Sequence, residues 1–362
     1  MKFGLFYLFS DFGNISQQTL FDEVLGEIED GEAMGFDSVW LPEHHFEIYG
    51  MLGNPLLLAA AVAQRTRTMK IGTAIVVLPF QHPLRTAEDA AMVDALSGGR
   101  LLLGVGRGYQ PPEFHGFGLN QDDSSEMFEE SMEIITRALS GEKFAYEGKF
   151  WQFKDAIEIY PKALQKPYPP LFVASVSRRS LDAAARYNMS LLRAPQFSNL
   201  DAVADAYDEY VTLGKGYGHD MTALDQPVSL RVHVAPTDAE AKALTEHALW
   251  FYHLLAKLVP GAKGRETVPK GYEKYPLDPD SLANLTLEDV WERGTVFGSP
   301  ERVIEIMKMY MHKLGARNFI IQMRVGGLTH DQVQRSMELF TNEVMPALRA
   351  EEVRLDGAVA AE

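Results

Sequence analysis

The chain contains no cysteine in 362 residues. This absence excludes disulfide bonds, thiolate-ligated metal ions, iron–sulfur clusters and cysteine nucleophiles. The composition is otherwise that of a globular protein, with 46% hydrophobic and 23% charged residues. A large core can therefore form without covalent cross-links.

Long apolar runs and positive charge are also scarce. Every apolar stretch is only as long as a strand, so we expect no membrane-spanning segment. Acidic residues outnumber basic ones by 50 to 34, a net charge of −16, which argues against nucleic acid as a partner. The run Met1–Phe9 lacks the apolar core and cleavage site of a signal peptide and predicts a buried strand. We therefore expect a cytoplasmic protein.

Apolar runs alternate with helical patterns along the whole chain. Predicted strands cover residues 3–9, 37–41, 70–78, 100–105, 171–175, 190–194, 228–235 and 318–323. Predicted helices cover residues 17–34, 54–66, 85–97, 122–139, 178–187, 199–213, 237–257, 299–314 and 329–348. Eight mostly apolar strands, each followed by a helix, predict a single α/β domain over residues 1–362 that forms a (β/α)8 TIM barrel. A doubly wound open sheet is the alternative.

Local signals mark several helix ends. Ser16 and Gly35 flank the first predicted helix as an N-cap and a C-terminal stop. Asn54-Pro55 and Ser299-Pro300 each place a capping residue before a proline at the first helical position.

Two connections are longer than a compact domain needs. Residues 140–170 are polar, aromatic and rich in proline, and predict an excursion from the barrel before the fifth strand. Residues 258–298 combine several prolines and glycines with many charges. Long loops in compact domains are usually functional or disordered, so we expect residues 258–298 to form a lid over an active site.

In a barrel, chemistry is expected at the carboxyl ends of the strands. Glu43, His44 and His45 follow the second strand directly. Adjacent side chains of an extended segment point opposite ways, so one of the two histidines is expected to face the barrel mouth. Imidazole transfers protons near neutral pH, which predicts acid–base catalysis. The alternative is a structural histidine pair.

Two segments could hold an anion. Arg107 lies in the glycine-rich stretch Gly104–Tyr109 after the fourth strand and could pair with a phosphate. Residues 174–180 follow the fifth strand with hydroxyls and arginines at the start of a helix, although N-capping by Ser177 explains them equally well. No zinc-binding H-E-x-x-H motif and no G-x-S-x-G nucleophile motif is present, and no metal site is predicted.

A set of short stretches spread along the chain forms a further pattern. The stretches are Met1-Lys2-Phe3-Gly4, residues 35–46, Leu52-Gly53-Asn54-Pro55, Gly72-Thr73-Ala74, Val77-Leu78-Pro79, residues 104–118 and Val344-Met345-Pro346. Together they resemble the bacterial luciferase-like flavin-dependent monooxygenases over nearly the whole chain. Glu43-His44-His45-Phe46 and Gly106-Arg107-Gly108 are particularly similar to the luciferase alpha chain.

The resemblance implies a two-component enzyme. It binds reduced FMN from a separate flavin reductase, and O2 and the flavin form a C4a-(hydro)peroxyflavin that oxygenates a small, mainly apolar substrate. An aldehyde or a ketone is the expected substrate, and light emission is not implied. Such a barrel must hold the flavin ring rigidly and exclude water.

The resemblance also implies roles for individual residues. The predicted catalytic residues are His44, Glu43 and Glu113. The predicted cofactor-binding residues are Glu43, Ala74, Ile75, Arg107, Tyr109, Ala174, Ser175, Val176, Ser177 and Arg179. The bond between Ala74 and Ile75 is expected to be a non-prolyl cis peptide beneath the flavin ring.

The chain departs from the luciferase alpha chain at two of these places. Gly106 stands where that chain has a reactive cysteine and is expected to enlarge the space above the ring. Ser125 stands where it has an arginine near the phosphate, and Arg178 or Arg179 is expected to compensate.

Two other functions share this barrel. One is a deazaflavin-dependent hydride-transfer oxidoreductase, and the other is a flavin-binding protein without catalysis. The resemblance further implies a homodimer, for which the apolar residues of helices 54–66 and 85–97 are the expected interface.

Overall fold

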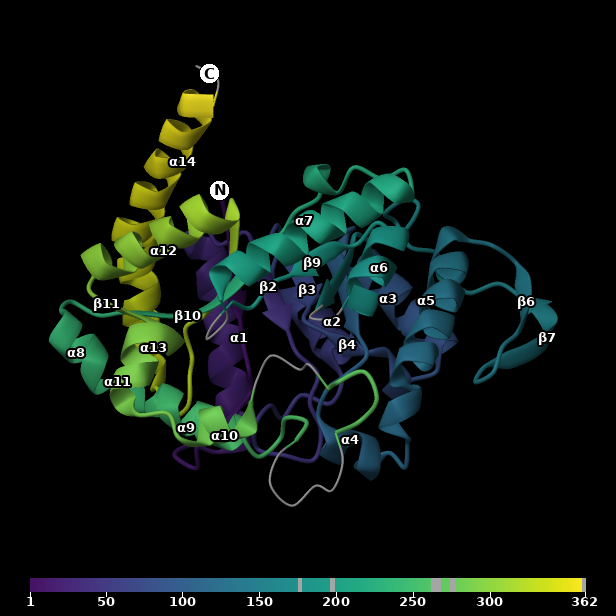
Figure 1. The fold of residues 1–362 in the computed structure, drawn as a ribbon, viewed down its shortest axis with the longest axis horizontal. Helices are drawn as coiled ribbons and strands as arrows, with labels where there is room; N and C mark the ends of the chain where they lie inside the picture. The colour runs from purple at the N-terminus through teal and green to yellow at the C-terminus, as the bar shows by residue number, and fades with distance from the viewer. Residues whose placement is uncertain (175–177, 196–198, 262–267, 274–277, 360–362) are drawn as a thin grey trace.

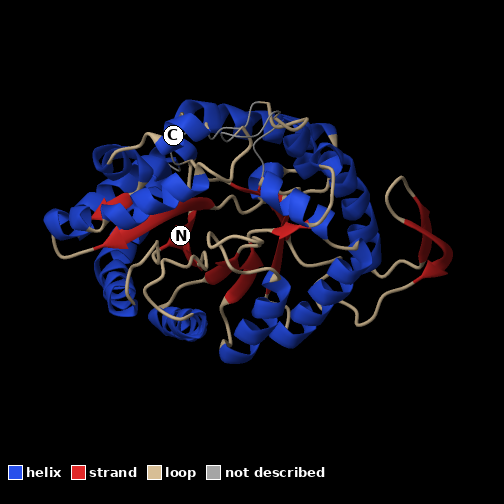
Figure 2. Ribbon diagram, turned by 90° about the horizontal axis from the view of Figure 1, so that it is seen from below, coloured by secondary structure: helices blue, strands red, loops and turns tan. Residues whose placement is uncertain are grey.

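The computed structural model describes residues 1–174, 178–195, 199–261, 268–273 and 278–359. In this part of the chain, a curled sheet of parallel strands lies inside a layer of helices, which Figure 2 shows as blue coils around red strands. None of the helices in the described ranges is long and apolar enough to cross a membrane.

The strands follow one another around the curled sheet. The order is β11 (Val296–Gly298), β10 (Val228–Val234), β12 (Asn318–Gln322), β1 (Lys2–Phe6), β2 (Ser38–Leu41), β3 (Lys70–Thr73), β5 (Leu101–Gly106), β8 (Leu171–Ala174) and β9 (Ser190–Leu192). The short strand β4 (Val76–Val77) pairs with β5 beside this path. Each of the eight predicted strand runs contains a strand, and all pairings in this sheet are parallel.

Helices cover the outside of the sheet. They are α1 (Gln17–Met34), α2 (Pro55–Arg65), α3 (Pro83–Ser97), α4 (Pro111–Gly116), α5 (Ser124–Ser140), α6 (Arg178–Arg186), α7 (Leu200–Gly216), α8 (Asp238–Ala243), α9 (Thr245–Leu255), α10 (Pro279–Ala283), α11 (Leu287–Asp289), α12 (Pro300–Leu314), α13 (His330–Leu339) and α14 (Met345–Val359). Short 3-10 or π turns are η1 (Leu78–Phe80), η2 (Gln121–Asp123), η3 (Met221–Ala223), η4 (Val290–Gly294) and η5 (Phe340–Val344).

The predicted helix ends are confirmed. The Ser16 side chain accepts a hydrogen bond from the Thr19 N–H at the start of α1, and Gly35 ends α1 in the left-handed conformation with φ of 92°. Asn54 and Ser299 likewise cap α2 and α12, each of which has proline at its start.

The interior of the curled sheet is filled by Trp40 from β2. Its ring packs against Phe172 at a centroid distance of 5.0 Å, and Ile320 completes this buried cluster. A side chain at Gly72 would overlap the indole, and one at Gly4 would come within 3.0 Å of its Nε1. Two glycines therefore make room for a solid floor beneath the carboxyl ends of the strands.

The two long connections have structure of their own. Residues 140–170 contain the antiparallel hairpin of β6 (Phe144–Glu147) and β7 (Gln152–Ile157), which projects from the body of the molecule at the right of Figure 1. The described part of residues 258–298 contains α10, α11, η4 and β11.

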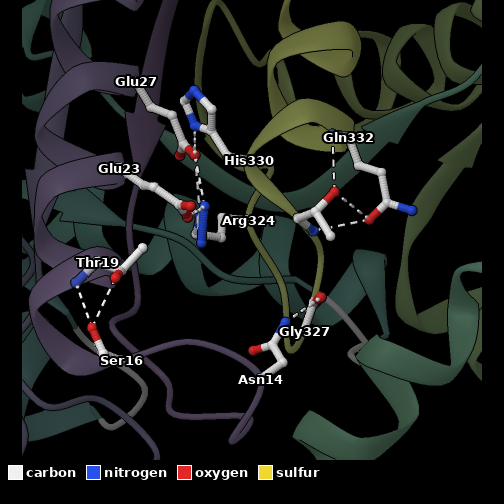
Figure 3. A network of polar contacts seen from close by, with 10 residues as sticks. Asn14, Ser16, Thr19, Glu23, Glu27, Arg324, Gly327, His330 and Gln332 are labelled. Carbon is white, nitrogen blue, oxygen red and sulfur yellow. Dashed lines mark hydrogen bonds and ion pairs between the residues drawn. The ribbon is translucent and has the colours of Figure 1, made fainter.

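A buried ion network joins α1 to the segment between β12 and α13. Arg324 pairs with Glu23 and Glu27, and the His330 Nδ1 lies 3.0 Å from the Glu27 Oε1 (Figure 3). Burial raises the pKa of the Glu27 carboxyl, and the positive charge of Arg324 opposes that rise. Although Glu23, Glu27 and His330 bring ligand atoms within 4.8 Å of one another, the guanidinium already supplies the neutralising charge.

Candidate active site

Two adjoining cavities lie at the carboxyl ends of the strands. The mouth cavity is lined by Phe6, Leu8, His44, Tyr49, Ala74, Tyr109, Ala174, Leu192, Arg193, Ala194, Ser229, Arg231, Tyr252, Leu255, Ile320 and Gln322. The side cavity is lined by Ile75, Arg107, Gly108, Tyr109, Ser125, Phe128, Glu129, Val173, Ala174, Arg179, Ser180, Ala183, Leu192, Ala194 and Tyr272. Four residues belong to both walls, so the two cavities lie directly beside each other.

His44 lines the mouth cavity and is held by Glu113 from α4. The His44 Nδ1 lies 3.0 Å from the Glu113 Oε1, and Glu113 is almost completely buried. The Gln110 Nε2 lies 3.1 Å from the same nitrogen, so both of these side chains contact Nδ1 and neither contacts the His44 Nε2. Glu113 also accepts the His45 N–H at 3.0 Å, which fixes it against the backbone after β2. This arrangement leaves one imidazole nitrogen free to take or give a proton.

Glu43 and His45 form a second pair that turns away from the mouth cavity. The His45 Nε2 lies 3.0 Å from the Glu43 Oε1, and the Val77 N–H donates to the Glu43 Oε2 at 3.0 Å. Neither residue lines the two cavities described above. Burial raises the pKa of the Glu43 carboxyl, and its hydrogen bonds oppose the rise. As the strand alternation predicts, only one histidine of the pair faces the mouth.

Ala74 and Ile75 contribute one residue to each cavity. The peptide bond between them is cis, as the resemblance implies. The expectation that Gly106 enlarges the space at this wall is wrong, because a side chain at position 106 would overlap the Ile75 Cδ1. Ile75 thus occupies the volume that a residue at 106 would otherwise take.

Arg107 lies in the side cavity and is already engaged on both of its terminal nitrogens. Its Nη1 donates to the Ser125 Oγ at 3.0 Å and its Nη2 donates to the Gly271 carbonyl at 2.7 Å. The guanidinium also lies 4.0 Å from the centre of the Tyr272 ring. Gly271 and Tyr272 belong to the predicted lid segment, which therefore contacts the predicted phosphate-binding arginine directly.

The remaining predicted anion-binding residues are only partly described. Arg179 lines the side cavity beside Ser180, and its Nε donates to the Glu129 Oε1 at 2.8 Å. Arg178 instead pairs with Glu209 at 3.1 Å and is largely exposed. Ala174 lies in both cavity walls. Ser175, Val176 and Ser177 lie outside the described residues.

The mouth cavity also contains residues that the sequence analysis missed. Ser229 and Arg231 alternate with buried apolar residues along β10, and Tyr252 and Gln322 come from α9 and β12. The signal for Arg231 was the alternation Val228-Ser229-Leu230-Arg231-Val232, because it places polar residues on one face of an interior strand.

Comparisons with known proteins agree with this architecture. Residues 1–318 match the family model described as luciferase-like monooxygenase. The alkanal monooxygenase alpha chain of the Kryptophanaron alfredi symbiont is 27% identical over 358 residues, which cover 96% of this chain and 99% of that protein. The oxygenase component of the flavin-dependent trigonelline monooxygenase of Acinetobacter baylyi is 25% identical, covering 93% of this chain and 92% of its own. The crystal structure of the monooxygenase RslO1 from Streptomyces bottropensis superposes with a TM-score of 0.84 at 27% identity, covering 96% and 99% of the two chains.

Proposed function

The chain belongs to the luciferase-like monooxygenases, and from this premise we propose that it is the oxygenase component of a two-component FMN system. A separate reductase supplies reduced FMN, and the enzyme uses O2 to oxygenate a small organic molecule such as an aldehyde or ketone. The observation that carries the proposal is the pair of adjoining cavities, one lined by His44 and the other by Arg107 and Arg179. The named monooxygenase relatives support the same reaction class.

The residues of the side cavity fit a phosphorylated flavin. Arg107 and Arg179 supply positive charge, and the hydroxyls of Ser125 and Ser180 supply hydrogen-bond donors beside them. The shared wall between the two cavities contains Ala174 and Ala194, whose small side chains leave room for a flat ring. When FMN is bound in its reduced form, it supplies the electrons that activate dioxygen. The protein's own residues must then position the ring, exclude water and manage the proton.

His44 is the residue that manages the proton in this proposal. His44 lines the mouth cavity, and its Nδ1 is contacted by Glu113 and Gln110. Glu113 is thus a positioning residue that holds the orientation of the imidazole ring. Tyr49 and Tyr109 pack against the imidazole ring with centroid distances of 4.8 Å and 5.9 Å, which further restricts its rotation.

We propose that residues 258–298 form a lid that excludes water. Its described part already contacts the site, because Tyr272 lies over Arg107 and its hydroxyl donates to the Gly108 carbonyl. The Lys270 N–H donates to Asp122 at 2.7 Å, which adds a second attachment. A closed lid over the phosphate end would retain the cofactor and keep bulk water from the flavin ring.

The curled sheet is best explained as a closed eight-strand barrel in one domain. The Arg193 N–H donates to the Pro227 carbonyl at 3.0 Å, and the Ser229 N–H donates to the Arg193 carbonyl at 2.7 Å. These bonds pair the segment directly after β9 with the start of β10. They support closure of the sheet and a solid wall around the mouth cavity.

We further propose that the enzyme is a cytoplasmic homodimer. Leu57 on α2 and Met92 and Leu96 on α3 are exposed to 73%, 47% and 50%, which is a large apolar area for neighbouring helices. Dimerisation through this face predicts a dimeric mass in light scattering and a monomer for Leu57→Glu/Leu96→Glu. A cytoplasmic location places the enzyme with the reductase, since reduced FMN must arrive before oxygen consumes it.

The test of the function is stopped-flow spectroscopy of the protein with anaerobically reduced FMN, mixed with oxygenated buffer. We expect a transient absorbance distinct from oxidised FMN, and a decrease of about 10²- to 10⁴-fold in the rate of its proton-dependent step in His44→Ala. His115→Ala is the matched control, because His115 is an exposed histidine of α4 and lines neither cavity. Reoxidation of FMN at the rate seen without protein contradicts the proposal and directs attention to a deazaflavin cofactor.

A further inference from the structure

The mouth cavity contains an arginine, Arg231, with which no carboxylate of the described residues forms an ion pair. We propose that Arg231 binds a flat, delocalised anion at this end of the cavity, so that the ligand held there carries a negative charge. This inference deepens the proposed function, because it specifies the chemistry of what occupies the mouth cavity.

Arg231 is held in place by a defined network. Its Nη1 donates to the Tyr252 hydroxyl at 2.8 Å, and that hydroxyl donates in turn to the Gly294 carbonyl at 2.6 Å. The guanidinium lies 4.2 Å from the centre of the Phe251 ring. Because the Tyr252 proton is committed to Gly294, its oxygen lone pair is aimed at Arg231. The cation is therefore fixed beside the cavity.

The partners of Arg231 do not balance its charge. In the described part of the chain it forms no ion pair, and its Nε is buried without a hydrogen-bond partner. Arg324 contrasts with it, since two carboxylates surround that guanidinium. Arg100 also contrasts, because it donates five hydrogen bonds, four of them to backbone carbonyls. A partly buried charge without a partner is unfavourable, and a bound anion would relieve it.

The surroundings of Arg231 limit the ligand. Ser229 and Gln322 line the same cavity and offer additional hydrogen bonds to an oxygen-bearing group. Phe6, Leu8 and Ile320 supply apolar walls. A planar guanidinium suits a planar anion with two acceptor atoms, such as a carboxylate or an enolate.

Two molecules could present this anion in the proposed reaction. One is the substrate, if it carries a carboxylate or an enolate. The other is the flavin itself, because its reduced ring can carry a delocalised negative charge. Both sources present a planar anion to Arg231. They differ in whether substrate binding or flavin binding depends on Arg231.

The experiment uses Arg231→Met, which removes the charge, and Arg231→Lys, which keeps it. Arg302→Met is the matched control, since Arg302 also lies 4.2 Å from an aromatic ring centre but lines neither cavity. Thermal melts check that each variant folds. Calorimetry then measures binding of benzoate and of neutral benzamide to the protein without flavin, and binding of oxidised and of anaerobically reduced FMN.

We expect wild-type protein to prefer benzoate over benzamide, or reduced over oxidised FMN, by about tenfold or more. Arg231→Met should abolish that preference, Arg231→Lys should retain most of it, and Arg302→Met should leave it unchanged. Loss of the benzoate preference assigns the site to the substrate, and loss of the reduced-FMN preference assigns it to the flavin.

The outcomes separate this inference from the proposed function. If neither preference exists in wild-type protein, or if both survive in Arg231→Met, the inference is overturned. If the protein fails to bind FMN but prefers benzoate in an Arg231-dependent manner, the anion site stands and the proposed function fails.

Discussion

Two buried clusters in this molecule combine histidine with glutamate, and they differ in what neutralises the carboxylate. Between α1 and α13, Glu27 has the permanent charge of Arg324 beside it, and His330 adds a further contact (Figure 3). After β2, Glu113 and Glu43 have only His44 and His45 as ion-pair partners among the described residues. A carboxylate that is balanced by arginine holds helices together. One that is balanced only by imidazole can take part in proton exchange, and of these residues only His44 lines the mouth or the side cavity.

Removal of the arginine should have the largest effect on stability. Arg324→Met leaves the buried Glu27 and the partly exposed Glu23 without their cation, and we expect a loss of about 3–5 kcal/mol in the free energy of unfolding. Urea denaturation measures the change. The matched control is Lys242→Met, which breaks the exposed pair with Glu288 and should cost less than about 1 kcal/mol. Equal losses in the two variants would contradict the assigned role of Arg324.

Removal of a carboxylate charge from the cluster after β2 should affect catalysis. Glu113→Gln keeps the shape of the side chain but removes its charge, so His44 loses its buried ion-pair partner. We expect the stopped-flow rate of flavin reoxidation to change by about 10- to 100-fold. Glu27→Gln, the corresponding change between α1 and α13, should lower stability while leaving that rate within twofold. If Glu113→Gln and Glu27→Gln changed the reoxidation rate to the same extent, the distinction between the two clusters would be contradicted.

The wall of the site allows a packing test. Gly106→Ala should destabilise the protein by about 1–3 kcal/mol, because the new Cβ overlaps the Ile75 Cδ1. Ile75→Val removes that atom, so the double variant Ile75→Val/Gly106→Ala should recover most of the loss. The two changes made separately and together form a double-mutant cycle in urea denaturation. If the changes in unfolding free energy of the two single variants simply add in the double variant, Ile75 does not occupy this space.

The smallest effect concerns pH. Burial raises the folded-state pKa of Glu43 above its ordinary value. The native state therefore holds this proton more tightly than the unfolded state, and the resulting stability is lost as pH rises from the ordinary glutamate pKa through the raised one. Glu43→Gln should flatten this part of the stability–pH curve while changing little at lower pH. An unchanged slope in urea denaturations across pH 4–8 would refute this assignment.

The sequence predicts every strand of the curled sheet except β11, because strands covered on both faces are continuous apolar runs. It does not predict β6 and β7, since β7 is mostly exposed and its sequence lacks such a run. Two long predicted helices, 237–257 and 329–348, are divided in the structure into α8 and α9 and into α13, η5 and α14. Helical periodicity continues through both breaks, so the pattern alone gives no sign of them.

The candidate site is predictable only in part. Position after a strand identifies His44, and strand alternation separates it from His45. The contact between Ile75 and Gly106 depends on two strands that are distant in sequence, so no local pattern reveals it. Arg231 was missed for a different reason, because it lies within a strand and not after one. The interior face of an amphipathic strand contributes to a site at the mouth of a curled sheet as directly as the loops do.

Trp40 gives the molecule a natural optical reporter. The indole forms the floor of the sheet interior together with Ile320, and Ile320 also lines the mouth cavity. A flavin seated above that floor would lie within range for resonance energy transfer from the indole emission to the flavin absorption. Quenching of the ultraviolet emission would then follow occupancy in real time without any label, and Trp40→Phe would remove the portion of the signal that comes from the site.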